Sequence, residues 1–356
     1  MSKKLFSSYK LGPITLANRV VMSPMTRNRS IGNVPGPLVA TYYSQRASAG
    51  LIITEGVSPS PNGLGYPRIP GLYSKEQVAA WKVVTDAVHQ KGGKIFVQLM
   101  HTGRVSHALN MPAGAKILGP SPVANAGTIW TDAAQMQAYP VPAEMTEAEI
   151  NTAIADYVHS ADCAIAAGFD GVELHGANGY LIDQFLNPAS NHRTDSWGGT
   201  PEKRLKFAIE VARQTAAKIG KDRLGIRLSP FGVFGAMEAF PEMEKTFETL
   251  ASELNKIGLV YLHVVDHSSM GAPALPATMK PRLRAAFKQT LILSGGYDAD
   301  HAEVDLNEGK GDLVAFGRPF ISNPNLVEKM QKGLPLANAD HETFYTPGEK
   351  GYTDYP

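Results

Sequence analysis

The 356-residue sequence contains a single cysteine, Cys163. One cysteine cannot form a disulfide within the chain, and it cannot supply the clustered thiolates that cysteine-based zinc or iron–sulfur sites require. Cys163 lies in an apolar stretch typical of a helix, so we expect a small buried side chain rather than a nucleophile. The composition therefore excludes an intrachain disulfide scaffold and a cysteine-ligated cluster.

Excess charge of one sign and long apolar segments are also lacking. Lys and Arg total 34 against 33 Asp and Glu, and the net charge is +1. Nucleic-acid binding and electrostatic attachment to a membrane both need clustered basic residues, so we expect neither. No apolar segment reaches the roughly 18 residues of a transmembrane helix, and the N-terminal MSKKLFSSYKLG lacks the apolar core of a signal peptide. We expect a cytoplasmic protein, monomeric or weakly homo-oligomeric, whose partner is a small molecule.

Eight short apolar segments recur along the chain, with helical stretches between them. Each is almost continuously apolar, as in parallel strands that are buried on both faces. Two of the helices have clear N-terminal signals, a capping box at Thr146 and Glu149 and a cap followed by proline at Thr200-Pro201. The predicted strands are residues 19–22, 51–54, 94–99, 171–174, 225–228, 261–265, 291–293 and 313–316.

Eight strands alternating with helices predict an α/β fold, a single (β/α)₈ TIM barrel that forms one domain over residues 1–356. An open doubly wound sheet is the alternative. Two stretches exceed a minimal barrel. Residues 101–145 form a long connection after the third strand, which we expect to cover the C-terminal face of the barrel. The tail from Asn338 carries Phe344, Tyr345, Tyr352 and Tyr355, and this density of aromatic residues predicts a docked tail.

Glycines follow the last two strands, as Gly295-Gly296 and as Gly317-Arg318. Barrel enzymes often bind phosphate with these two loops, at the C-terminal ends of the strands. Glycine lets backbone N–H groups approach an anion closely, and Arg318 adds a permanently charged, forked donor. Paired glycines also occur in simple turns, so the prediction of a phosphate site depends on both loops being in the expected places.

Thr26, Gln98 and Arg227 stand at the ends of the first, third and fifth strands. They are neither a metal-ligand set nor a nucleophile with an adjacent base. Together they suit a flat heterocycle with alternating donors and acceptors, and a flavin fits. Gln98 can pair with the pyrimidine edge, and Arg227 can hold the negative charge of the reduced ring. The alternatives are a salt bridge for Arg227 and a satisfied buried amide for Gln98.

His175, Asn178 and Tyr180 lie in one short turn after the fourth strand. His175 and Asn178 can converge on one oxygen, as an oxyanion hole requires, and Tyr180 can act as a general acid. His101 and His267 are weaker candidates, for which a structural role is an equally good interpretation. The strand ends contain too few His and Asp residues for the three or four ligands of a metallohydrolase.

These residues lie in motifs that resemble the old yellow enzyme family along nearly the whole chain. The bacterial N-ethylmaleimide and pentaerythritol tetranitrate reductases are members to which it is similar. The matching motifs are Asn18-Arg19-Val20-Val21-Met22-Ser23-Pro24-Met25-Thr26-Arg27, Val97-Gln98-Leu99 with His101-Thr102-Gly103-Arg104, His175-Gly176-Ala177-Asn178-Gly179-Tyr180-Leu181, His192-Arg193-Thr194-Asp195 with Gly198-Gly199, Phe316-Gly317-Arg318 and Gly351-Tyr352-Thr353-Asp354-Tyr355-Pro356.

The resemblance implies an FMN-dependent ene-reductase that oxidises NADPH or NADH and reduces an electron-poor alkene such as an α,β-unsaturated carbonyl, a maleimide or a nitroalkene. His175 and Asn178 would bind the substrate oxygen, Tyr180 would protonate Cα, and Tyr66 and Tyr345 would line the substrate pocket. Thr26 would act in catalysis by donating a hydrogen bond to the flavin O4 and tuning its reduction potential. No metal is implied. The residues expected to hold FMN are Pro24, Thr26, Gly56, Gln98, Arg227, Gly295, Gly296, Gly317 and Arg318.

Two positions depart from many relatives. Met100 stands where many have tryptophan, and Asn178 where some have histidine, which donates equally well.

A nitrate-ester or nitro-compound reductase on the same flavin site is the alternative function. A dienoyl-CoA or amine-oxidising relative is disfavoured by the single cysteine, because such relatives carry a cysteine-ligated cluster. A phosphate- or flavin-binding barrel without activity is the third hypothesis.

Overall fold

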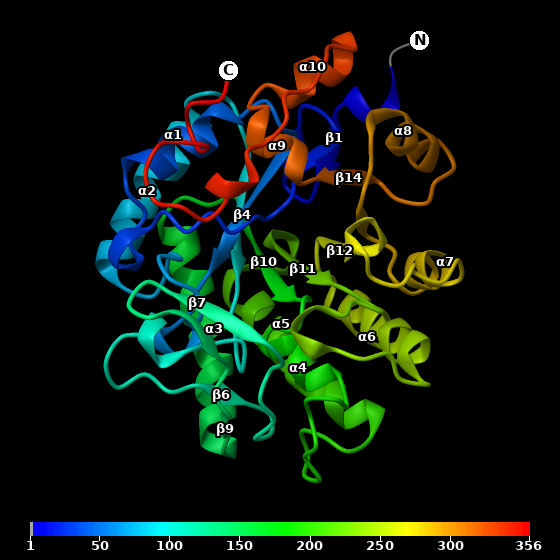
Figure 1. Cartoon of the computed structure of the whole chain (residues 1–356). Helices are drawn as coiled ribbons and strands as arrows, with labels where there is room; N and C mark the ends of the chain where they lie inside the picture. The colour runs from blue at the N-terminus through cyan, green and yellow to red at the C-terminus, as the bar shows by residue number, and fades with distance from the viewer. Residues whose placement is uncertain (1–2) are drawn as a thin grey trace.

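The computed structural model describes residues 3–356 and contains a closed barrel of eight parallel strands with helices around it (Figure 1). Every predicted strand is present, so the (β/α)₈ TIM barrel is confirmed and the open sheet is wrong. In the order of pairing, the strands are β10 (Gly171–Gly176), β11 (Leu224–Leu228), β12 (Tyr261–Val265), β13 (Thr290–Ser294), β14 (Leu313–Phe316), β3 (Val20–Met22), β4 (Leu51–Val57) and β5 (Ile95–Leu99).

The helices pack outside the barrel, and two begin where the sequence predicts. The side chains of Thr146 and Glu149 form a complete capping box, and Thr200 caps the other helix. No helix of the described residues has the length and apolar character needed to cross a bilayer. The helices are α1 (Pro37–Gln45), α2 (Lys75–His89), α3 (Glu147–Ala166), α4 (Leu181–Leu186), α5 (Pro201–Ile219), α6 (Met243–Ile257), α7 (Met279–Ala286), α8 (Ala299–Asn307), α9 (Arg318–Ser322) and α10 (Leu326–Lys332).

The N-terminal end of the barrel is closed by an antiparallel hairpin, β1 (Tyr9–Leu11) with β2 (Ile14–Leu16). Leu11 and Leu16 are fully buried in a cluster with apolar side chains of the strands, including Phe96. Because this end is filled with apolar side chains, the cavity of the barrel opens at the other end.

Strand β4 runs three residues past its predicted end, because a register shift between Ile53 and Gly56 lets it continue beside β5. The long connection at residues 101–145 also carries structure that the sequence did not predict. It forms the antiparallel pair β7 (Thr128–Thr131) and β8 (Gln135–Ala138) and the parallel pair β6 (Leu118–Gly119) and β9 (Ala143–Glu144).

The C-terminal tail is docked, as predicted. The ring of Tyr352 is buried and stacks on Tyr42 with centroids 4.1 Å apart. The Arg27 guanidinium donates to the carbonyl oxygens of Phe344 and Gly351, at 3.1 and 2.6 Å.

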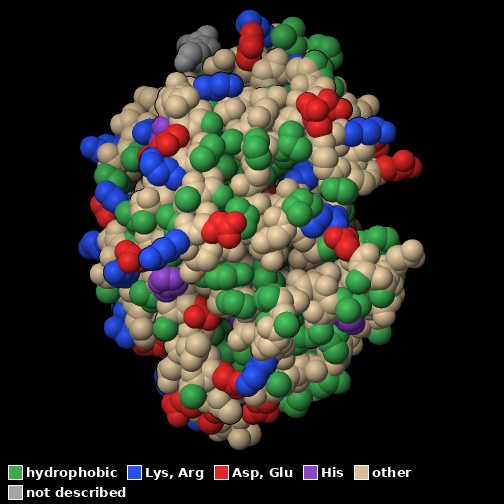
Figure 2. Space-filling model, turned by 90° about the vertical axis from the view of Figure 1, so that its left-hand side faces the viewer, with side chains coloured by type: hydrophobic (Ala, Val, Ile, Leu, Met, Phe, Trp, Pro, Cys, Tyr) green, Lys and Arg blue, Asp and Glu red, His purple; other side chains and the backbone are tan. Residues whose placement is uncertain are grey.

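On the face that Figure 2 shows, acidic and basic side chains are intermingled.

Candidate active site

A cavity of about 1500 Å³ lies at the C-terminal ends of the strands, and residues at the ends of all eight strands line it. The predicted site residues come from positions spread over some three hundred residues of the chain, yet the structure brings all of them to this one cavity. They are Pro24, Thr26, Gly56, Tyr66, Gln98, His175, Asn178, Tyr180, Arg227, Gly295, Gly296, Gly317, Arg318 and Tyr345.

The glycines at the expected phosphate end differ in why they are glycines. Gly295 and Gly296 have φ angles of 125° and 67°, and a Cβ at Gly295 would clash with the Asp266 carbonyl oxygen. Gly317 has a φ of −99°, and a Cβ there would have no described protein atom nearer than 3.7 Å. Neither backbone strain nor packing requires glycine at Gly317, so the space beside it suits a ligand that approaches the backbone. The exposed Arg318 side chain has no protein partner among residues 3–356 and is free to bind an anion.

At the heterocycle end, Arg227 is 7% exposed, and its buried Nε has no hydrogen-bond partner in the described chain. The salt bridge considered for this residue is therefore absent there. Gln98 is partly satisfied, because its Nε2 donates to Glu173 Oε1 at 2.8 Å, which leaves its carbonyl oxygen for a ligand. A guanidinium and an amide oxygen that still have hydrogen-bonding capacity fit the pyrimidine edge of a flavin.

The turn after β10 contributes a third group of polar atoms without hydrogen-bond partners. His175 Nδ1 and Asn178 Oδ1 are buried and have no partner among the described residues. Tyr180 packs edge-on against the His175 ring, with centroids 4.8 Å apart, and its hydroxyl shares a hydrogen bond of 3.1 Å with Tyr66. Buried polar atoms are rarely left unpaired, so the presence of several in residues that line one cavity indicates a site suited to a polar ligand.

The protonation states of these groups suit neutral donors. Burial, reinforced by the charge of Arg227, holds the pKa of His175 well below its ordinary value, so the imidazole is neutral at pH 7. Burial raises the pKa of Tyr180 to about 12, so the hydroxyl keeps its proton. A neutral histidine that donates to a ligand and a tyrosine that holds a proton are what polarisation followed by general-acid catalysis needs.

Sequence reasoning missed the residues that shape this turn. Asn178 has a φ of +60°, in the left-handed region that few residues other than glycine adopt. Its backbone N–H donates to Ser229 Oγ at 2.9 Å, and the N–H of Gly179 donates to Asp183 Oδ2 at 2.9 Å. Ser229 follows β11, 51 residues after Asn178, so no local pattern could pair the two.

Other cavity residues also escaped prediction. The β7–β8 hairpin contributes Ile129 and Trp130, and the loop after β11 contributes Phe234. Met100 lies against Gly56, where a Cβ would be 2.5 Å from the Met100 sulfur. The glycine is therefore what lets the methionine occupy this part of the wall.

The two doubtful histidines differ. His267 lines the cavity with an unpartnered Nδ1. His101 does not line it; its Nδ1 accepts from the N–H of Gly103 at 3.1 Å, so His101 is structural.

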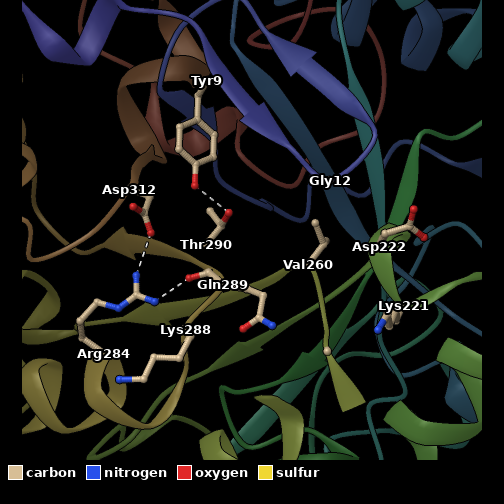
Figure 3. Close-up of a pocket in the computed structure, with 11 residues that line it drawn as sticks. Tyr9, Gly12, Lys221, Asp222, Val260, Arg284, Lys288, Gln289, Thr290 and Asp312 are labelled. Carbon is tan, nitrogen blue, oxygen red and sulfur yellow. Dashed lines mark hydrogen bonds and ion pairs between the residues drawn. The ribbon is translucent and has the colours of Figure 1, made fainter. Parts of the chain in front are cut away.

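A second hollow, of about 330 Å³, lies at the opposite end of the barrel (Figure 3). Some of its polar side chains are bonded to one another or to the backbone. The Tyr9 hydroxyl lies 2.9 Å from Thr290 Oγ1, and Arg284 pairs with Asp312 at 2.8 Å and donates to the Gln289 carbonyl. The hollow is far smaller than the cavity at the C-terminal ends of the strands, and none of the predicted site residues lines it.

Comparison with known proteins agrees with this geometry. Residues 4–337 match the family described as NADH:flavin oxidoreductase / NADH oxidase. The chain is 44% identical to chanoclavine-I aldehyde reductase of Penicillium roqueforti and 41% identical to 12-oxophytodienoate reductase 1 of Oryza sativa subsp. japonica, over 99% of this chain and 96% and 92% of those proteins.

Solved structures resemble this chain over nearly their whole length. Morphinone reductase superposes with a TM-score of 0.96 at 41% identity, covering 100% of this chain and 96% of that one. The old yellow enzyme homologue from Zymomonas mobilis superposes with a TM-score of 0.94 at 38% identity, covering 99% of each chain. The chain therefore belongs to the NADH:flavin oxidoreductase family, the old yellow enzyme family of FMN-dependent oxidoreductases.

Proposed function

We propose that this chain is an ene-reductase that takes electrons from NADPH or NADH and reduces the C=C bond of α,β-unsaturated carbonyls, maleimides or nitroalkenes. One observation carries the proposal. His175 and Asn178 line the cavity beside Tyr180, whose hydroxyl keeps its proton, and the same cavity is lined by the residues expected to hold the cofactor. Relatives named morphinone reductase and 12-oxophytodienoate reductase support a conjugated ketone as substrate.

The cofactor groups divide along the cavity. Gln98 and Arg227 would hold the pyrimidine end of FMN, and Thr26 would donate its hydroxyl to the ring system. Pro24 and Gly56 would contact the ring through their backbone. FMN, when bound, would supply the redox chemistry, in which two electrons from a nicotinamide pass to the alkene as a hydride equivalent. Gly295, Gly296, Gly317 and Arg318, which line the same cavity, would hold the phosphate.

His175 and Asn178 bind the carbonyl or nitro oxygen of the substrate. The imidazole N–H of His175 and the Nδ2 amide group of Asn178 donate hydrogen bonds to this oxygen, and the two bonds draw electron density from the conjugated C=C bond, so that Cβ becomes electrophilic. The neutral state of His175 limits this to hydrogen bonding without proton transfer to the oxygen. The left-handed backbone at Asn178, held by Ser229, fixes where the amide lies.

Tyr180 donates its hydroxyl proton to Cα of the substrate, while Cβ receives the hydride equivalent. The Tyr180 O–H, which now donates to the Tyr66 oxygen, must turn toward the substrate. After Tyr180 has given up its proton, the Tyr66 hydroxyl can donate a hydrogen bond to the phenolate oxygen of Tyr180. Tyr66 therefore lowers the cost of forming a tyrosinate in a cavity that otherwise raises the pKa of Tyr180. Tyr345, which is 59% exposed, lies at the rim and limits the size of the substrate.

An anaerobic titration tests the proposal. The purified yellow protein is expected to bleach with NADPH or NADH and to regain its colour when 2-cyclohexenone is added. Cyclohexanone, which lacks the C=C bond, is the matched control and is expected to leave the protein bleached. The proposed activity would be refuted if the reduced protein stayed bleached with all three substrates: the enone, a maleimide and a nitroalkene.

A further inference from the structure

The barrel interior contains a buried carboxylate to which the proposed chemistry assigns no role. Glu173 lies on β10, two residues before His175, and its side chain is 0% exposed. Its oxygens accept from Gln98 Nε2 at 2.8 Å and from the Tyr261 hydroxyl at 3.1 Å, and one lies 2.9 Å from His263 Nδ1. Strands β5, β10 and β12 thus place four fully buried polar side chains in one network.

This network is costly for a barrel core. A buried carboxylate loses its hydration, and apolar residues of similar volume often stabilise a core better. Among the described residues, only His263 lies within ion-pair distance of Glu173. Burial lowers the pKa of His263, so the ring is neutral and donates its Nδ1 proton, while its Nε2 faces Ser294 Oγ at 3.1 Å. No full positive charge pairs with Glu173, so stability alone does not explain it.

The first consequence is the orientation of Gln98. An ionised carboxylate only accepts hydrogen bonds, so it takes the NH₂ end of the Gln98 amide. The carbonyl end is then left for the cavity, which Gln98 lines. A flavin carries one N–H on its pyrimidine edge, between two carbonyl groups, and an amide that presents oxygen complements that N–H.

The second consequence is electrostatic. Arg227 lies on β11, which is hydrogen-bonded between β10 and β12, and its Cα pairs in register with His175 and His263. Burial lowers the pKa of Arg227, and the negative charge of Glu173 partly opposes this lowering. A cation beside the pyrimidine edge favours the reduced, negatively charged ring, and a nearby anion partly offsets that preference.

We propose that Glu173 is a positioning residue of the cofactor site, which turns the Gln98 oxygen toward the flavin pyrimidine ring and offsets the charge of Arg227. It thereby sets both the affinity for FMN and the reduction potential of the bound flavin. This inference rests on the proposed placement of FMN in the cavity.

Glu173→Gln tests it, because this change removes the charge and keeps the volume. Two properties are measured: the FMN dissociation constant, from the fluorescence of added FMN on the stripped protein, and the midpoint potential of the bound flavin. We expect about 10-fold or greater loss of FMN affinity, as for a hydrogen bond to a charged group, and a higher midpoint potential. Wild-type values for both properties would overturn the inference.

Two further variants separate the roles. Gln98→Met removes the amide and keeps the Glu173 charge. It is expected to weaken FMN binding with little change in potential, because the flavin N–H is present in both redox states. Tyr261→Phe removes one hydrogen bond to Glu173 but neither its charge nor its bond to Gln98, and it is the matched control. A shift in potential as large in Tyr261→Phe as in Glu173→Gln would refute the electrostatic role.

These results are distinguishable from failure of the proposed function. If the wild-type protein binds FMN and reduces enones while Glu173→Gln behaves like it, the inference about Glu173 alone is wrong. If Glu173→Gln does not fold, as judged by its circular dichroism, Gln98→Met still tests the link between amide orientation and FMN affinity. Unchanged affinity in that variant would then overturn the inference.

Discussion

The two ends of the barrel are built from the same strands but treat polar groups in opposite ways. At the N-terminal end, Tyr9 bonds Thr290 and Arg284 bonds Asp312 beside the apolar plug of β1 and β2 (Figure 3). At the C-terminal end, His175 Nδ1, Asn178 Oδ1 and Arg227 Nε have no partner within residues 3–356. The Tyr9 and Arg284 bonds help to hold the N-terminal end together, whereas His175, Asn178 and Arg227 line the cavity and each have a polar atom that no described residue satisfies.

The difference predicts that changes at the two ends have separable effects. Substitutions at the C-terminal end should lower turnover with little loss of stability, and some should stabilise the fold. Substitutions at the N-terminal end should lower stability and leave turnover unchanged. The following experiments test this separation, beginning with the largest expected effect.

Tyr180→Phe removes the proposed proton donor and keeps the ring that packs on His175. We expect reduction of 2-cyclohexenone by the reduced enzyme to slow by about 10²–10⁴-fold, the usual contribution of a general acid, while reduction of the enzyme by NADPH keeps its rate. Stopped-flow absorbance measures both half-reactions. Equal slowing of the two would contradict the role assigned to the hydroxyl.

Asn178→Gly removes the amide that we propose binds the substrate oxygen, and it keeps a residue that tolerates the φ of +60°. The rate with the enone should fall by about 10²–10³-fold, as for the loss of one oxyanion donor. Asn33→Gly is the matched control, because Asn33 has a φ of 62° outside the cavity. A comparable loss of rate in Asn33→Gly would show that backbone flexibility, not the amide, causes the effect.

Glu55→Gln probes the cost of a carboxyl buried at the C-terminal end. Burial raises the pKa of Glu55 from an ordinary value of about 4.5 to about 7. The unfolded chain therefore releases this proton first, and the wild type loses stability as the pH rises between these values. The loss should be about 3 kcal/mol larger in the wild type than in Glu55→Gln.

Urea unfolding at a series of pH values measures this difference. Below about pH 4.5 the Glu55 carboxyl is protonated in both states, so its pH-dependent contribution should vanish there. Asp183, whose pKa burial also raises to about 7, acts in the same direction, so Asp183→Asn should flatten the profile similarly. A steeper fall in stability in Glu55→Gln than in the wild type would contradict the sign of this prediction.

Arg284→Gln tests the N-terminal end and should have the smallest effect. The change removes the pair with Asp312 and the bonds to the Phe287 and Gln289 carbonyls. We expect a loss of about 1–2 kcal/mol in the free energy of unfolding and unchanged enone turnover. Lys288→Gln, in the same hollow but without a side-chain partner in the described chain, should leave both unchanged. Reduced turnover in Arg284→Gln would break the separation between the two ends.

The sequence predicts most of the barrel because buried parallel strands are continuous apolar segments, such as 261–265, which β12 reproduces. It predicts the place of the site because all strand ends of one direction meet at one face. It could not predict that β4 continues past Thr54, because the bulge depends on pairing with β5. The short strands β1 and β2 were missed for the same reason, since each is stabilised by its partner.

The site shows the same limit. Gln98 was found from its strand, but its orientation depends on Glu173, which is 75 residues away. The unpartnered state of His175 Nδ1 and the Ser229 bond to the Asn178 backbone depend on side chains from other strands. Local sequence patterns reveal the residue types and the order of the strands. Which polar atoms lack partners, and which groups are protonated, depends on how distant segments pack together.

The docked tail has a consequence for how the enzyme is made. All eight strands precede residue 317, yet His341, Phe344 and Tyr345 form part of the cavity wall, and Arg27 holds this segment through backbone carbonyls. During synthesis the barrel can close before its binding site is complete. A protein shortened at residue 340 would keep its scaffold but lose one wall of the cavity, so correct secondary structure in such a fragment would not indicate a competent enzyme.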